Sequence, residues 1–424
     1  MQLIENLKVK EKLYMEKLES GLTIMIIPKP NTIKKYIIWG PNFGSIDNKF
    51  VAPTDTNETS IPDGVAHFLE HKLFEQENGT NSLDVLSALG VEANAYTTND
   101  HTAYLFEATD NFYEALDELM NYVQNPYFTD ENVEKEKGII AQEIKMYDDE
   151  PGWQVYMNAM KLMYKNNPVN IDIAGSVESI SNINKDILYK AYNTFYNLSN
   201  MTMVVCGDFE PEKILQEIKN RIVKKDIQGS IKRIYEEEPE QIVEKEKIVK
   251  LEVQNPIFVI GFKDKVVETQ EIVKKHITIQ VLLNMIFGKS SKLYKRLYES
   301  GQIMVQPELY YEFSKQYAHV LISGQAQNPQ NVIKEFKTEL QNFKKCELDK
   351  KYFERIKKKI YGEHISEYND VGSIARMFLS DSFKGINSFD YLEEYNGVTV
   401  EYAKNILEEV FDENKMVVSI VEGK

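Results

Sequence analysis

The sequence predicts an α+β protein made of two homologous domains, each an antiparallel-rich sheet with helices packed on one face. Two observations support this prediction. Elements predicted from the apolar pattern recur in the same order in both halves of the chain, about half its length apart, which indicates a duplication. Strand-like and helix-like stretches do not alternate strictly, and hairpin-like strand pairs open each half, which favours α+β over a parallel α/β fold.

The predicted elements follow the same course in both halves. In the first half, two strands and a short helix precede a strand at 101–110, a helix at 112–126, a long helix beginning at 130, a helix at 185–196 and a closing strand at 201–208. In the second half, the matching elements are a strand at 256–264, a helix at 274–288, a strand at 318–327, helices at 331–343, 349–368 and 400–411, and a closing strand at 415–423.

A charged segment separates the halves. The stretch that begins "VKKDIQGSIKRIYEEEPEQIVEKEK" has little apolar periodicity and is typical of a surface linker. We therefore expect an N-terminal domain at 1–222, a linker at 223–246 and a C-terminal domain at 247–424.

Composition narrows the classes of function. Of the 424 residues, 42% are hydrophobic and 27% charged, as in globular proteins. A net charge of −16 argues against nucleic acid and anionic membranes as partners. No apolar run approaches the roughly 18 residues that span a bilayer, and the N-terminus lacks a signal-peptide core. With Cys206 and Cys346 expected as thiols, the chain is expected to be cytoplasmic.

The stretch "HFLEH" carries the clearest chemical signal. His67 and His71 are four residues apart, so on a helix they point about 40° from each other and can share one metal ion. Glu70 lies beside the second histidine, where it can act as a base. The spacing is the HxxEH pattern of inverzincins. The alternative is that these are ordinary polar residues beside a core stripe.

A third metal ligand is expected from the long helix that begins at residue 130. Glu136 and Glu143 are two turns apart and share a stripe with apolar residues, where a carboxylate is costly unless a cation compensates it. Their spacing does not tell which of the two binds the metal. Both could instead be solvated at the edge of the helix.

The stretches "DGVAHFLEHKLFE", "LGVEANAYTTNDHTAYLFEA" and "VEKEKGIIAQEIKMYDDEP" resemble the pitrilysin/insulinase family of zinc metallopeptidases, in the bacterial branch akin to mitochondrial processing peptidase. The resemblance implies that His67, His71 and Glu143 bind Zn²⁺. It makes Glu70 the general base and Glu136 a supporting carboxylate. It also implies that the two domains form half of a clamshell.

The resemblance extends to substrate binding. "EANAYT" is similar to the family's edge strand, on which Asn94 and Ala95 would hold a peptide backbone as an added strand. Without the family it is equally well an ordinary edge strand. The second half contains no HxxEH, so we expect a domain that keeps the fold without the metal.

The function implied is a zinc-dependent metalloendopeptidase that hydrolyses peptides or unfolded polypeptide segments. One alternative is a dedicated peptidase that removes the leader of a ribosomally made peptide. Another is a non-catalytic subunit of a peptidase-like complex, which is disfavoured because both histidines and the candidate base are present.

The sequence departs from the family in one segment of the second half. Family members commonly carry an arginine and a tyrosine there that contact substrate. In "SSKLYKRLYESGQIMVQ", Tyr298 stands at the arginine position and Met304 near the tyrosine, while Arg296 is two residues away. The resemblance therefore suggests a heterodimer in which a homologous partner subunit supplies the pair. A homodimer that uses other donors remains the alternative.

Overall fold

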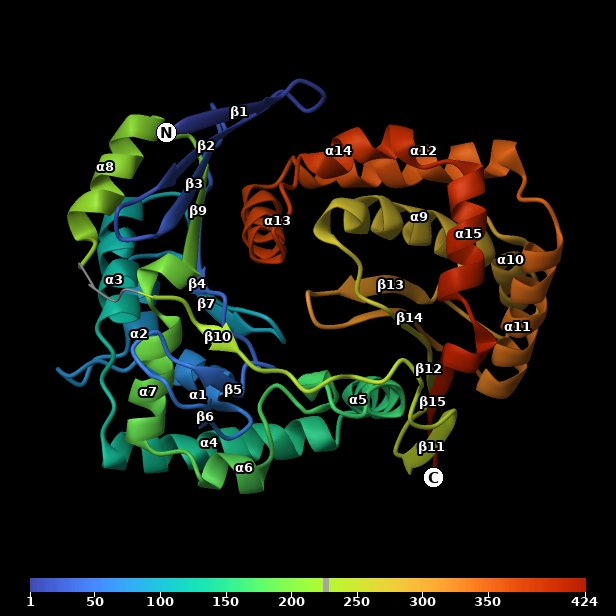
Figure 1. Cartoon of the computed structure of the whole chain (residues 1–424), viewed down its shortest axis with the longest axis horizontal. Coiled ribbons are helices and arrows are strands. Elements are labelled where there is room, and N and C mark those ends of the chain that lie inside the picture. The colour runs from blue at the N-terminus through green and yellow to red at the C-terminus, as the bar shows by residue number, and fades with distance from the viewer. Residues whose placement is uncertain (224–228) are drawn as a thin grey trace. The chain divides into compact units, whose positions relative to one another are not determined.

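The computed structural model describes residues 1–223 and 229–424, which form two compact units (Figure 1). Unit 1 comprises Met1–Ile144, Asp172–Tyr235 and Ile365–Ser388, and unit 2 comprises Lys145–Ile171, Glu236–His364 and Phe389–Lys424. Each unit thus combines most of one half of the chain with a segment of the other half, whereas the sequence predicts continuous domains. Residues 224–228 of the predicted linker lie outside the described residues.

Unit 1 is built on a seven-stranded sheet. Its strands, in spatial order, are β1 (Gln2–Asn6), β2 (Glu11–Lys17), β3 (Thr23–Pro28), β9 (Met201–Gly207), β4 (Lys35–Pro41), β8 (Thr102–Ala108) and β7 (Glu92–Thr97). Only β3 and β9 pair in parallel; the other neighbours are antiparallel. A small second sheet contains β10 (Lys232–Arg233), β5 (Lys49–Val51) and β6 (Thr59–Ser60).

Helices cover both faces of this sheet. The helices of unit 1 include α1 (Val65–Lys72), α2 (Ser82–Ala88), α3 (Phe112–Gln124), most of α4 (Asp130–Asp148), α6 (Val177–Ser181), α7 (Lys185–Phe195), α8 (Pro211–Arg221) and α13 (Val371–Lys384). On β4, Ile37 packs in the core with α3, while Tyr36 contacts Arg376 of α13. Because successive strand residues point to opposite faces, α13 lies across the sheet from α3 (Figure 1).

Unit 2 is built on a five-stranded sheet. In spatial order its strands are β11 (Glu246–Leu251), β15 (Met416–Gly423), β12 (Ile257–Asp264), β14 (Ala318–Gln325) and β13 (Glu308–Phe313). Its helices include α5 (Pro151–Met163), α9 (Thr269–Phe287), α10 (Lys292–Glu299), α11 (Pro329–Lys345), α12 (Lys350–Glu367), α14 (Asp390–Glu394) and α15 (Val400–Val410). Phe262 of β12 meets Phe336 of α11, while the adjacent Gly261 lies against Met163 of α5. Helices therefore cover both faces here too.

The two sheets repeat one topology. The order β3-β9-β4-β8-β7 in unit 1 matches β11-β15-β12-β14-β13 in unit 2, and the first pair is parallel in both. The predicted α+β class and the predicted duplication are therefore confirmed. The structure adds a helix on the second face of each sheet, α13 in unit 1 and α5 in unit 2. Among the described residues, no helix is long and apolar enough to cross a membrane.

Candidate functional site

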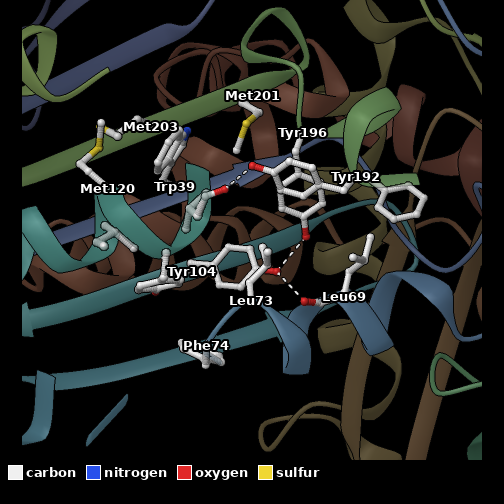
Figure 2. Close-up of a cluster of buried hydrophobic side chains, with 14 of the residues drawn as sticks. Trp39, Leu69, Leu73, Phe74, Tyr104, Met120, Tyr192, Tyr196, Met201 and Met203 are labelled. Atoms are coloured by element: carbon white, nitrogen blue, oxygen red, sulfur yellow. Dashed lines mark hydrogen bonds between the residues drawn. The ribbon is translucent and has the colours of Figure 1, made fainter. Parts of the chain in front are cut away.

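Helix α1 presents the HxxEH residues on one side because its other side is part of the core. Phe68 and Leu69 are fully buried. The backbone carbonyl of Leu69 faces the hydroxyl of Tyr104, which lies 2.8 Å from the hydroxyl of Tyr196 (Figure 2). This packing leaves His67, Glu70 and His71, which are only partly buried, on the opposite side of the helix.

Gly64 fixes the start of α1. Its φ of 93° lies in the left-handed region, and a Cβ atom there would come within 2.4 Å of the carbonyl oxygen of Ala174. Only glycine satisfies both conditions. The start of α1, and with it the position of the HxxEH residues, therefore depends on Gly64.

Helix α4 brings its two glutamates to different nitrogens of the histidines. The Glu143 oxygens lie 3.6 Å from Nε2 of His67 and 3.5 Å from Nε2 of His71. Glu136 Oε1 lies 3.0 Å from Nδ1 of His71, which donates a hydrogen bond to it when Nε2, the nitrogen that faces Glu143, is unprotonated. The geometry therefore distinguishes the roles of Glu136 and Glu143, which their spacing in the sequence does not.

The residues present fit a metal ion. One donor atom from each of His67, His71 and Glu143 lies within 4.8 Å of the others. Two imidazoles and one carboxylate are a typical donor set for catalytic zinc, which keeps one position open. Burial and the neighbouring His71 lower the pKa of His67 to about 3, so its imidazole is neutral and able to coordinate.

Glu136 and His71 stabilise each other. Although burial alone would lower it, the hydrogen bond to Glu136 and the negative charge of that residue raise the pKa of His71. Burial would raise the pKa of Glu136, but the same hydrogen bond and the charge of His71 lower it. This pairing is the carboxylate–histidine support that orients metal-binding imidazoles.

Glu70 is held by Thr97, a residue that no motif in the sequence marks. The hydroxyl of Thr97, the last residue of β7, donates a hydrogen bond of 2.6 Å to Glu70 Oε2. Burial raises the pKa of Glu70, and the Thr97 hydrogen bond opposes that rise. The signal in the sequence is slight, because a threonine that ends an edge strand is common.

A pocket of about 430 Å³ opens beside these groups. Glu70 and His71 form one wall, and Asn94 and Ala95 of β7 form another. Strand β7 is the outermost strand of the sheet, pairing with β8 alone among the described strands. The side chain of Asn94 accepts a hydrogen bond from the Ala95 backbone N–H. This backbone donor on the free edge of β7 is therefore already engaged. All the predicted site residues therefore lie around one pocket or in the adjoining cluster of His67, His71 and Glu143.

No comparable cluster occurs in the part of the second half that the structure describes. Among the described residues, His67, His71 and Glu143 are the one group of three metal-binding side chains placed together. His276 of α9 contacts the hydroxyl of Tyr391 instead, and His319 of β14 contacts the hydroxyl of Tyr164.

Comparison with known proteins places the chain in a family. Residues 55–177 match the family described as insulinase (peptidase family M16), and residues 182–360 match the peptidase M16 inactive domain. An uncharacterized zinc protease of Bacillus subtilis, YmfH, is 39% identical over 428 residues, covering 99% of both chains. A crystal structure of an M16-like protein of Alicyclobacillus acidocaldarius has a TM-score of 0.93 at 32% identity, covering 98% of this chain and 99% of that one.

A more distant relative is named as one subunit of an enzyme. It is the probable mitochondrial-processing peptidase subunit beta of Arabidopsis thaliana, 26% identical over 174 residues, which cover 39% of this chain and 32% of that one. The full-length match to the zinc protease of Bacillus subtilis and the two family matches agree with the duplicated fold and with the motif on α1. The chain therefore belongs to the insulinase family of peptidases, peptidase family M16.

Proposed function

We propose that this protein is a zinc-dependent endopeptidase that hydrolyses extended peptide segments. The observation that carries the proposal is the convergence of His67, His71 and Glu143 beside a carboxylate, Glu70, that lines the adjoining pocket together with His71. His67 and His71 would hold zinc through Nε2, with Glu143 as the third ligand. Zinc bound there would lower the pKa of a water molecule and polarise the scissile carbonyl.

The protein's own groups supply the remaining chemistry. Glu70 is the general base that takes a proton from the attacking water and returns it to the leaving amine. Thr97 holds one oxygen of Glu70, so the other oxygen is left for this proton transfer. Asn94 and Ala95 on the free edge of β7 bind the peptide backbone as an added strand, once Asn94 releases the Ala95 N–H.

The test separates metal binding from catalysis. The purified chain is expected to hold about one zinc ion, as three protein ligands allow. His67→Ala and Glu143→Gln should lose the zinc, whereas Glu70→Gln should retain it and lose roughly a hundredfold or more in kcat on a fluorogenic peptide. Glu131→Gln, an exposed glutamate on α4, is the matched control. A zinc-loaded Glu70→Gln enzyme with full activity would contradict the proposal.

We further propose that a homologous partner subunit completes the catalytic site. Tyr298 and Met304 occupy the positions at which the family's arginine and tyrosine are expected, and their side chains are 53% and 74% exposed. The guanidinium of Arg296 pairs instead with Glu335 at 2.9 Å. The relative from Arabidopsis thaliana carries the word subunit in its name.

The partner proposal is tested by comparing isolated and paired proteins. The isolated chain should cleave flexible fluorogenic peptides slowly, and addition of a homologue that lacks HxxEH but keeps the arginine and tyrosine should accelerate it. One lost donor to the developing oxyanion costs about a hundredfold or more. Full activity of the isolated chain, unchanged by the partner, would favour a homodimer or a self-sufficient enzyme.

A further inference from the structure

Lys72 is a buried cation next to the cluster of His67, His71 and Glu143. It directly follows His71 in α1, and its side chain is 0% exposed. Lysines are almost never fully buried unless they are paired, because removing an ammonium group from water is expensive. Its position four residues after Phe68 places it on the core-facing stripe of the helix, where an apolar residue would cost less.

The ammonium group of Lys72 contacts two carboxylates. It makes a close ion pair with Glu75, just after the turn that follows α1, and lies 3.7 Å from Glu136 Oε2. The other oxygen of Glu136 is the one that bonds Nδ1 of His71. One carboxylate therefore connects the buried lysine to the histidine, in the order Lys72, Glu136, His71.

The geometry points to Lys72 as a positioning residue of the metal centre, which acts by holding Glu136 in place behind His71; this inference rests on the zinc site proposed above. The Glu136 side chain is only 12% exposed. Without a cation beside it, a carboxylate at that depth is stabilised by turning toward water. The His71 imidazole would then lose the acceptor that fixes its orientation.

Glu75 competes for the same ammonium group. Its side chain is 34% exposed, so water can stabilise it without Lys72. Removing the negative charge of Glu75 leaves Lys72 to interact with Glu136 alone. Removing Lys72 or neutralising Glu75 should therefore have different effects on zinc affinity, although each breaks the same ion pair. A merely structural role of that ion pair predicts the same effect for both.

The experiment measures the zinc affinity of the full-length protein by competition with a chromogenic chelator. Lys72→Met, which keeps the length of the side chain, should weaken zinc binding about tenfold or more, as loss of supporting groups around metal ligands does. Glu75→Gln should bind zinc at least as tightly as the unmodified protein. Lys145→Met, an exposed lysine on α4, is the control and should leave the affinity unchanged.

A double-mutant cycle identifies the route of the effect. If Lys72 acts through Glu136, Lys72→Met should change zinc affinity less than about twofold when Glu136→Gln is already present. An unchanged affinity in Lys72→Met, a weaker affinity in Glu75→Gln, or a full effect of Lys72→Met in the Glu136→Gln background would each overturn the inference. Glu75→Gln tests it even if Lys72→Met does not fold. If the unmodified chain binds no zinc, that result contradicts the proposed function itself, and the inference about Lys72 falls with it.

Discussion

At the residue scale, the crossing of α1 and α4 sets which histidine nitrogen each glutamate approaches: Glu136 lies at Nδ1 of His71 and Glu143 at Nε2 of the same residue. The spacing of His67, Glu70 and His71 predicts a shared side of one helix, and the structure places them there. The spacing of Glu136 and Glu143 predicts a shared face, and this symmetry is the reason that residues alone do not assign a role to either. The difference arises from which nitrogen each carboxylate approaches, and that depends on how two distant helices cross.

Thr97 gives a prediction at this scale. Its hydroxyl donates to Glu70 Oε2 at 2.6 Å, and hydrogen bonds to charged groups contribute about 1.5–3 kcal/mol. Thr97→Val keeps the shape of the side chain but removes the donor, so we expect kcat to fall roughly tenfold while KM and zinc content stay near those of the unmodified protein. Thr97→Ser should restore most of the rate. A full rate in Thr97→Val together with a loss in Thr97→Ser would show that packing of the methyl group, and not the hydrogen bond, matters.

At the element scale, the sequence predicts strands and amphipathic helices well but gives no element over α5 or α13. These two helices are the ones that each half contributes to the unit formed mainly by the other half. The predicted linker is also divided between the two units. Arg233 pairs with Asp47 in unit 1, whereas Glu238 pairs with Lys263 in unit 2. An apolar pattern tells that a face is buried but not which sheet buries it.

The pocket between α1, α2, α4 and β7 predicts a substrate preference. Phe74, Leu83 and Ile139 give it an apolar wall, and the last two are exposed hydrophobic side chains. Burying a large apolar side chain contributes about 1.5–3 kcal/mol, so peptides with Leu or Phe beside the scissile bond should be cleaved at least tenfold faster than peptides with Gly. Mass spectrometry of a cleaved peptide library measures this preference.

Ile139 allows a controlled test of that preference. Ile139→Asp should remove most of the discrimination between Leu and Gly. Met146→Asp changes another exposed apolar residue of α4, one that is not part of the pocket wall, and should leave the discrimination intact. If both variants behave like the unmodified protein, the pocket does not receive the side chain beside the scissile bond.

At the scale of the whole molecule, α5 and α13 are exchanged between the halves, and we expect each half to depend on the other for folding. Helix α13 covers the second face of the unit 1 sheet and buries Ile374, Phe378 and Leu379. At about 1.5–3 kcal/mol each, these three side chains contribute roughly 5–9 kcal/mol. That is comparable to the entire net stability of a typical protein, about 5–15 kcal/mol.

A split chain tests this dependence. Residues 1–222 expressed alone lack α13, so the exposed sheet face should cause aggregation or loss of cooperative thermal unfolding. Co-expression with residues 223–424 should restore a soluble complex, detected by copurification through a tag on one fragment. Leu379→Asp in the second fragment should prevent that rescue, because it buries an unpaired charge against the sheet. A soluble fragment 1–222 that unfolds cooperatively on its own would show that the strands and helices of the first half suffice, and that α13 is an addition to a domain already stable without it.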